Sequence, residues 1–260
     1  MEFLTAALSS DILAGLTEFS QSALFVARGT GYTVALILGA MILGLALGLP
    51  LSTFEVYGAG WLRKITWVYV WFFRGIPILV LLFLIYFGVF DIIESTVYKL
   101  FETRISLTPF TASVIALGLA SAAYQSQIFK GAILSLPAGQ FQAARALGFS
   151  RSQAIIHIIL PQAMRLSIPA WSNEYSILLK DSAVAYVLGT MEIMARTRFM
   201  TSTTFAHIRL YLLAGLLYYL LTWLGVKVLF KIEAKTRIPG LGHDAWRADD
   251  QLVLKKRDLF

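Results

Sequence analysis

Residues 29–54 read GTGYTVALILGAMILGLALGLPLSTF and contain no Asp, Glu, Lys or Arg. Two further stretches, 105–129 and 210–226, also lack these charged residues. A helix needs about 20 mostly apolar residues to cross the hydrocarbon core of a bilayer. Lipid offers no hydrogen-bond partner to a free backbone N–H or C=O group, so such stretches are expected to be helical. The sequence therefore predicts an all-α, polytopic membrane helix bundle.

The composition of the whole chain agrees with that class. Apolar residues make up 58% of the 260 residues and charged residues 14%, whereas soluble domains carry about 25% charged residues. The fourth predicted span is the least apolar, because it holds Glu174, Lys180 and Asp181. Without it the chain would have four spans, and both termini would lie on one side. Hydropathy favours about five spans, near residues 30–51, 65–90, 109–131, 167–190 and 209–231.

The spans divide the chain into three predicted regions. Residues 1–28 form an N-terminal extracytoplasmic or interfacial segment, 29–231 form the transmembrane domain, and 232–260 form a cytoplasmic tail. The N-terminal segment has no basic start and is not expected to be a cleavable signal peptide. Its apolar residues form one helical stripe, which either lies in the membrane interface or packs against the spans: Leu4, Leu8, Ile12, Leu16 and Phe19.

The basic residues predict the orientation, because cytoplasmic loops are enriched in Lys and Arg. The larger group comprises the tail from Lys227 onward and Arg63, Lys64, Lys130, Arg145, Arg151 and Arg165. The smaller group comprises Arg28, Lys99, Arg104, Arg196, Arg198 and Arg209. The N-terminus is therefore expected outside and the C-terminus in the cytoplasm. This topology explains the net charge of +7 without nucleic acid, and the basic tail suits anionic lipid headgroups.

The connection at residues 136–161, which we call the elbow, carries local signals for two short helices. Residues 138–147 are mostly good helix formers, and Gly148 follows where a helix commonly ends in a left-handed residue. Ser150 precedes Gln153 by three positions, the spacing of a capping box that starts a second helix. Pro161 is expected to end or kink that helix. The elbow is either a docking site for a partner or an ordinary surface hairpin.

The elbow resembles the EAA loop of ABC importer permeases. The matching run is Gln142-Ala143-Ala144, three residues, Gly148, nine residues, Ile158, one residue and Leu160-Pro161. Gln142 stands where that family usually has glutamate. The resemblance implies that the elbow is a coupling helix that docks into a cleft of a cytoplasmic ATPase. The residues expected to dock are Gln142, Ala143, Ala144, Arg145, Leu147, Gly148 and Phe149.

Three further runs resemble signatures of the polar amino-acid permeases, the histidine, glutamine and arginine type. FRGIP at 73–77 is similar to an Arg-Gly-Thr-Pro signature, with Ile76 in place of Thr. YQSQIFKGAI at 124–133 is similar to the third-span signature, with Gln127 where glutamate is frequent. NEYSILLKDS at 173–182 is similar to the fourth-span signature. The resemblance implies a type I ABC importer fold.

Charged residues inside spans usually face a bundle interior or an aqueous cavity. Glu174 and Asp181 are seven positions apart, which places them on one helix face about 10 Å apart along the axis. They are interpreted either as a polar path for a zwitterionic solute or as structural pairs between spans. For Arg74 the alternative is snorkelling to headgroups. The residues expected along the path are Glu174, Asp181, Lys180, Ser182, Tyr124, Gln127 and Arg74.

No phosphate-binding loop of the form G-x-x-x-x-G-K-[ST] occurs in the sequence. The chain is therefore expected to be a transport subunit and not an enzyme, with no cofactor or metal of its own and with ATP and magnesium used by a partner ATPase. The resemblance implies two ATPase subunits, a second permease chain and an extracytoplasmic solute-binding protein. The replaced glutamates, at Gln127 and Gln142, favour a heterodimer of permeases slightly. The alternative function is an ion-gradient-driven secondary transporter or channel, for which Glu174 and Asp181 would be ion sites.

Overall fold

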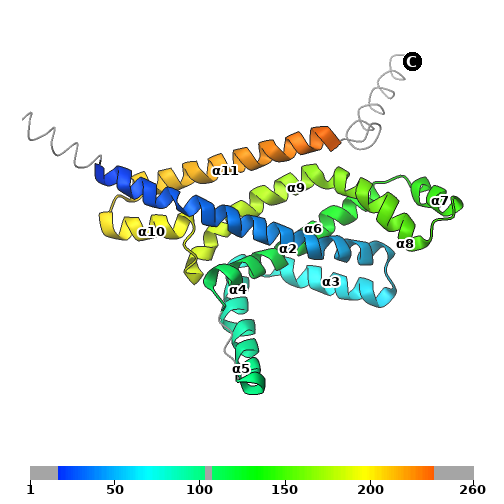
Figure 1. Ribbon diagram of the computed structural model, residues 1–260, viewed down its shortest axis with the longest axis horizontal. Coiled ribbons are helices and arrows are strands. Elements are labelled where there is room, and N and C mark those ends of the chain that lie inside the picture. The colour runs from blue at the N-terminus through cyan, green and yellow to red at the C-terminus, as the bar shows by residue number, and fades with distance from the viewer. Residues whose placement is uncertain (1–16, 103–106, 237–260) are drawn as a thin grey trace, which may run out of the picture. The chain divides into compact units, whose positions relative to one another are not determined.

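The computed structural model describes residues 17–102 and 107–236, and Figure 1 shows the order of the helices along the chain. Within these ranges the regular secondary structure is entirely helical. The predicted stripe from Leu4 to Leu16 and most of the predicted tail lie outside the described residues. Helical structure over the described ranges is what the charge-free runs predict.

The first predicted span is confirmed and is longer than expected. Residues 17–27 are helical, and after a turn at Arg28 the helix α2 runs over Gly29–Tyr57. No charged residue interrupts it before Glu55, and Pro50 lies inside it. The helix passes through Pro50 without ending, although proline removes one backbone donor.

The second predicted span, 65–90, is two helical pieces in the structure. Helix α3 covers Gly60–Gly75, and the chain breaks at Ile76 and Pro77. The residue before a proline is disfavoured in helical geometry, which explains why the break falls here. The second piece extends to residue 101, further than predicted, as α4 (Ile78–Phe83), the π-helical turn η1 (Leu84–Val89) and α5 (Phe90–Phe101).

The later helices follow the predicted order. They are α6 (Pro109–Leu134), α9 (Leu160–Ser182), the 3-10 helix η3 (Ala183–Leu188), α10 (Ile193–Thr204) and α11 (His207–Thr236). Among the described residues, three helices are long and apolar enough to cross a membrane: 17–57, 78–101 and 207–236. Helices α6 and α9 have sufficient length, 26 and 23 residues, and carry more polar side chains.

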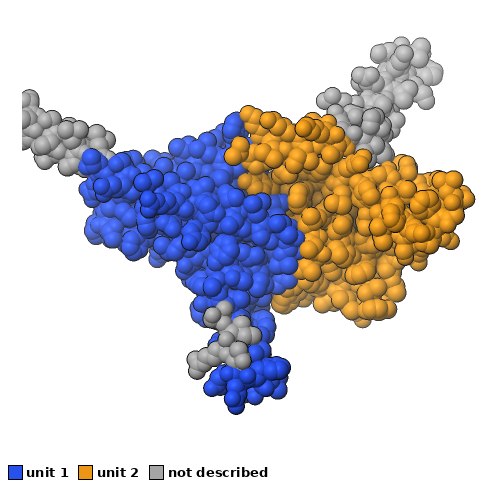
Figure 2. All heavy atoms as spheres, viewed as in Figure 1, with its two compact units in different colours: residues 1–43, 76–120, 176–223 blue, residues 44–75, 121–175, 224–260 orange. Residues whose placement is uncertain are grey.

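The chain divides into two compact units, which Figure 2 colours separately. Unit 1 comprises Met1–Leu43, Ile76–Ala120 and Ser176–Trp223, and unit 2 comprises Gly44–Gly75, Ser121–Tyr175 and Leu224–Phe260. Each has its own apolar core. The core of unit 1 includes Val26, Ile193, Leu210 and Ala214, and that of unit 2 includes Ala132, Ile133, Leu136, Ile159 and Ala163.

Glycines let α2 approach α6 closely inside unit 2. A Cβ atom on Gly48 would lie 3.0 Å from the carbonyl oxygen of Ala122 and 3.0 Å from Cβ of Gln125. A Cβ atom on Gly44 would collide with the amide of Gln125. Small residues are typical of membrane helix interfaces, where association depends on tight packing. The two glycines therefore fix the distance between these helices.

We expect Gly48→Val to destabilise the protein, because the added side chain meets backbone atoms of α6. Overpacking of this kind costs about 1–3 kcal/mol. The matched control is Gly31→Val, since nothing lies within 4 Å of a Cβ atom at Gly31. Thermal unfolding of the purified protein in detergent measures both effects. Equal melting temperatures for Gly48→Val and wild type would contradict this account of the packing.

Candidate functional site

The first half of the elbow ends in a left-handed turn at Gly148. Helix α7 covers Gly139–Ala146, and Gly148 has φ +87°. The N–H of Gly148 donates to the carbonyl of Arg145 at 3.1 Å, and the N–H of Phe149 donates to the carbonyl of Ala144 at 3.2 Å. This pair of bonds is the Schellman motif, which satisfies the last carbonyls of a helix. The predicted stop at Gly148 is confirmed.

The second half of the elbow begins at the predicted capping box. The side chain of Ser150 accepts from the Gln153 N–H at 3.3 Å, and the Gln153 side chain accepts from the Ser150 N–H at 2.8 Å. Helix α8 (Arg151–Ala154) starts there and continues through the π-helical turn η2 (Ile155–Ile159) into α9.

Pro161 was predicted to end or kink this helix, and the helix does not end there. Pro161 is the second residue of α9, which continues to Ser182. A proline ring normally clashes with the carbonyl of the preceding α-helical turn. Here that turn is the wider π turn η2, which makes room for the ring. The elbow and the fourth predicted span are thus joined through continuous helical structure.

Two contacts fix the elbow to the end of α2, within unit 2. The Arg151 guanidinium donates from Nη2 to the carbonyl oxygen of Tyr57 at 2.6 Å. The rings of Tyr57 and Phe141 stack with their centroids 5.9 Å apart and their planes 20° apart. Ala144 is buried, 4% exposed, where α7 packs against the rest of the unit. The elbow is therefore attached firmly at both of its helices.

A third contact links the same end of α2 to α6. Glu55 accepts from Lys130 Nζ at 2.6 Å and from Gln127 Nε2 at 2.8 Å. Gln127 is one of the predicted path residues, and its side-chain amide takes part in this cluster. Neither Glu55 nor Tyr57 was singled out from the sequence, since their partners lie more than 70 positions away.

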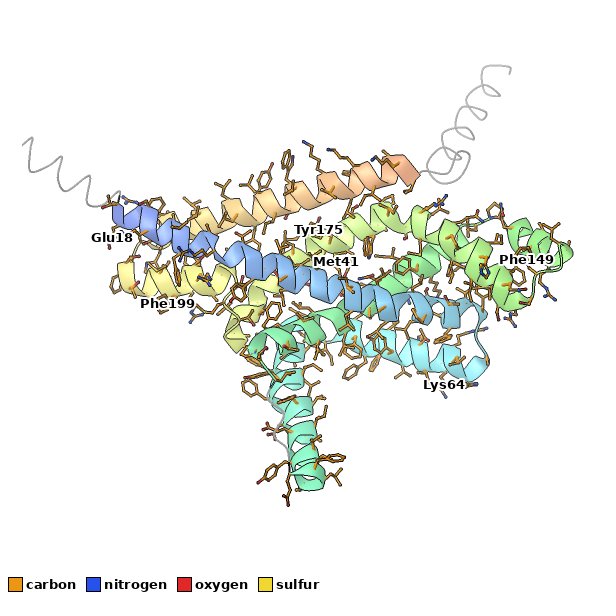
Figure 3. All side chains as sticks on the ribbon, viewed as in Figure 1. Glu18, Met41, Lys64, Phe149, Tyr175 and Phe199 are labelled. Carbon is orange, nitrogen blue, oxygen red and sulfur yellow. The ribbon has the colours of Figure 1, made fainter. Side chains whose placement is uncertain are left out.

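The predicted docking residues are mostly on the surface of the elbow. Leu147 is 79% exposed, directly before the turn, and Phe149 is half-buried at its far side (Figure 3). Arg145 donates from Nη1 to the carbonyl of Phe149 at 2.8 Å, which braces the turn. The remaining exposed members are Gln142, Ala143 and Gly148. Leu147 is therefore an exposed apolar side chain on a turn that hydrogen bonds hold in place, and we call this side chain the knob.

The predicted path residue Glu174 lies inside unit 2 and is only 4% exposed. Ser121 on α6 donates from Oγ to the Glu174 carboxylate at 2.7 Å, and Gln125 donates to Ser121 at 3.1 Å. Ser121 and Gln125 are one helical turn apart in an apolar helix. That spacing is the signal in the sequence that could have identified them. The carboxylate is thus positioned by hydrogen bonds from a neighbouring helix.

The structure also brings together two other predicted path residues. The Arg74 guanidinium lies over the ring of Tyr124, 4.9 Å from its centroid. Such a cation–π contact holds an arginine beside an aromatic face. Both residues are exposed in the chain, so the pair presents a positive charge and a ring on the surface of unit 2.

The last three path candidates lie at the end of α9, in unit 1. Lys180 is exposed, Asp181 is partly buried, and Ser182 is buried and donates to the Leu179 carbonyl at 2.7 Å. Asp181 follows Glu174 by two turns of the same helix, as the spacing predicts. The helix changes to 3-10 geometry directly after Ser182.

A buried carboxylate that the sequence analysis did not single out is Glu192, which is fully buried in unit 1. It caps α10 by accepting from the N–H groups of Met194 and Ala195 at 2.8 and 2.7 Å, and it accepts from the Tyr218 hydroxyl at 2.6 Å. Burial raises the pKa of Glu192, and these hydrogen bonds act in the opposite direction. Glutamate is not among the preferred N-cap residues, which explains why the sequence analysis missed it.

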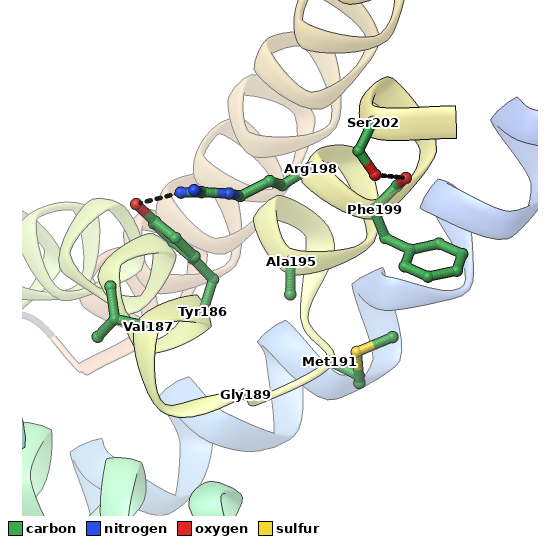
Figure 4. A pocket seen from close by; sticks show the side chains of 8 residues that line it. All are labelled: Tyr186, Val187, Gly189, Met191, Ala195, Arg198, Phe199 and Ser202. Carbon is green, nitrogen blue, oxygen red and sulfur yellow. Dashed lines mark hydrogen bonds between the residues drawn. The ribbon is translucent and has the colours of Figure 1, made fainter. Parts of the chain in front are cut away.

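A hollow of about 360 Å³ and a larger one of about 560 Å³ indent the surfaces of the two units. The larger one lies between η3 and α10 in unit 1, as Figure 4 shows. On its rim Arg198 donates to the Tyr186 hydroxyl at 3.1 Å, and its guanidinium lies 5.1 Å from the centre of that ring. The smaller hollow lies on α3.

The chain is similar to proteins of known family. The family described as "Binding-protein-dependent transport system inner membrane component" matches residues 40–235. The probable amino-acid permease protein YxeN of Bacillus subtilis is 36% identical over 190 residues, 73% of this chain and 81% of that protein. The octopine transport system permease protein OccQ of Rhizobium meliloti is 35% identical over 211 residues, 80% and 89% of the two chains.

A solved structure agrees with these relatives. A chain of an amino acid ABC transporter with histidines superposes with a TM-score of 0.69 and 27% identity, covering 85% of this chain and 97% of that one. The fold is accordingly that of a type I ABC importer permease, with about five transmembrane helices. The family match covers α6, α9 and the complete elbow. The chain therefore belongs to the family of binding-protein-dependent transport system inner membrane components, the multi-pass, non-enzymatic permease subunits of ABC importers, which work with a separate ATPase.

Proposed function

We propose that the chain carries polar amino acids across the cytoplasmic membrane of a bacterium or archaeon, and that its elbow receives the mechanical work of the ATPase. The elbow carries this proposal: an EAA-like run folded as two capped helices around Gly148, with an exposed apolar knob. Relatives named as amino-acid and octopine permeases support the substrate class.

In this proposal ATP binding closes two ATPase subunits, and the elbow moves with them. Arg151 and the Tyr57–Phe141 stack tie the elbow to α2, and the helix from α8 through η2 ties it to α9. Movement at the elbow is therefore passed directly to two helices. A rigid-body switch between inward-open and outward-open states is a common way for a ligand to bias transport.

The proposed assembly contains further subunits. A second permease chain completes the path, and an extracytoplasmic binding protein delivers the solute. Gln127 and Gln142, which replace glutamates of the family pattern, favour a heterodimer. This chain binds no cofactor, and ATP and magnesium are used by the ATPase. The N-terminus faces outward and the C-terminus inward, where the basic tail lies beside anionic lipid; nucleic acid is not a partner.

The proposed solute path includes Glu174 and Asp181, whose carboxylates would lie near the ammonium or side-chain cation of the solute. Arg74, held on Tyr124, would supply a positive charge to a carboxylate. Lys180, Ser182 and Gln127 belong to the same proposed path. The alternative, an ion-gradient-driven secondary transporter, would use the same acids as ion sites and is not favoured by the family match.

We expect Gly148→Val to uncouple ATP hydrolysis from uptake in proteoliposomes. A β-branched residue in the left-handed region is strained by about 1–2 kcal/mol, so the turn would rearrange. Gly148→Asn is the matched control, because asparagine tolerates this conformation and adds a side chain of similar size. Uptake should fall at least tenfold for the valine variant and stay near wild type for the asparagine variant. Undiminished uptake by Gly148→Val at normal expression would contradict the role of the turn.

Leu147→Asp should weaken binding of the ATPase, since a charge replaces an apolar side chain that is 79% exposed. The measurement is the amount of ATPase that remains with the affinity-purified permease. Phe199→Asp, at a side chain 55% exposed on α10, is the control and should leave retention unchanged. Full retention by Leu147→Asp would show that the knob does not dock.

Glu174→Gln should preserve the bond to Ser121 and remove the charge. Transport of cationic amino acids is expected to drop at least tenfold, whereas ATPase retention stays normal. Asp91→Asn on exposed α5 is the matched control. Unchanged affinity and rate of the Glu174→Gln variant for every amino acid tried would refute its place in the path and leave a structural role.

A further inference from the structure

Helix α3 has two distinct faces. Its inner face packs against unit 2, with Thr66 only 1% exposed and Tyr69 and Phe73 partly buried. Its outer face is apolar as well, yet uncovered by the described part of the chain. Trp61, Ile65, Val68 and Trp71 recur on it at the helical spacing and are 65%, 58%, 47% and 67% exposed.

A hollow of about 360 Å³ lies along this outer face. It is lined by Trp61, Lys64, Ile65 and Val68, which follow one another over two helical turns. Lys64 therefore lies at the edge of an otherwise apolar groove, and Figure 3 labels it on α3. A groove of this kind accepts a molecule with an apolar portion and an adjoining negative charge.

Within the described part of the chain, the basic residues at the start of α3 have no acidic partner. Residues 56–90 contain no Asp or Glu; Arg63 and Lys64 lie at the start of α3, and Arg74 lies in its last turn. Arg63 and Lys64 are exposed and form no ion pair within the described ranges. Glu55, the acid that precedes them in sequence, already accepts from Lys130 and Gln127.

We propose that the outer face of α3 binds one anionic phospholipid, with its phosphate beside Lys64 and an acyl chain along Trp61, Ile65 and Val68. A basic residue at the edge of an apolar surface attracts anionic headgroups through charge, and tryptophan is favoured at the headgroup level. Arg63 and Lys64 lie at the start of α3, in the part of the chain that is expected on the cytoplasmic side, where anionic lipid would meet them. The bound lipid would steady the helix that follows α2 and the elbow contact at Tyr57.

Quenching of Trp61 by brominated lipids tests this site. The complete transporter is reconstituted in two sets of phosphatidylcholine vesicles. One set contains brominated phosphatidylglycerol, and the other contains brominated phosphatidylcholine at the same mole fraction. The contribution of Trp61 is the difference between wild type and Trp61→Phe, since the chain has five other tryptophans. Phosphatidylglycerol should quench this contribution at least twice as strongly as phosphatidylcholine.

The variants separate a defined site from general charge attraction. The double change Arg63→Gln and Lys64→Gln should abolish the stronger quenching by phosphatidylglycerol, and Lys64→Arg should retain it. The matched control, Lys231→Gln with Lys235→Gln at the end of α11, should also retain it. Equal quenching by the two lipids in wild type, or loss of the preference in the control, would overturn the proposal. Absence of quenching by either lipid would overturn it too, because another protein chain would then cover the face.

Discussion

The left-handed turn at Gly148 is the constraint on which the elbow depends. It reverses the chain between α7 and α8 and satisfies the last carbonyls of α7 through the N–H groups of Gly148 and Phe149. The capping box at Ser150 then starts the next helix at once. One end of the turn is thus fixed by backbone hydrogen bonds, and the other by the side chains of Ser150 and Gln153. The exposed Leu147 consequently has one defined direction, which a force-transmitting contact requires.

Three carboxylates follow a second constraint, that a buried polar atom needs a partner. Glu174 meets Ser121, Glu55 meets Lys130 and Gln127, and Glu192 meets the start of α10 and Tyr218. These bonds connect helices at fixed points and leave apolar surface elsewhere. Glu55 and Tyr57 both lie at the end of α2. Glu55 binds α6 and Tyr57 binds α8, and this end of α2 is therefore held by two helices.

Helices and caps that depend on nearby residues could be predicted from the sequence, whereas contacts between distant residues could not. Charge-free runs gave the helical class, and Gly148 and Ser150 gave the two caps, because each acts within a few residues. The continuation of the helix through Pro161 was not predicted, since it depends on the width of the preceding turn η2. Glu55 and Tyr57 were missed because their partners lie far along the chain. Glu192 was missed because glutamate is not a preferred N-cap residue and because Tyr218, one of its partners, lies 26 positions away.

The proposed coupling requires that the elbow faces the cytoplasm and touches the ATPase. The chain contains no cysteine, so Leu147→Cys introduces one unique thiol at the knob. The decisive measurement is cross-linking of this thiol in the assembled transporter, together with its labelling by a membrane-impermeant maleimide in intact cells. The account predicts a cross-link to the ATPase and no labelling from outside. Labelling from outside, or a cross-link to no ATPase in an intact complex, would contradict it.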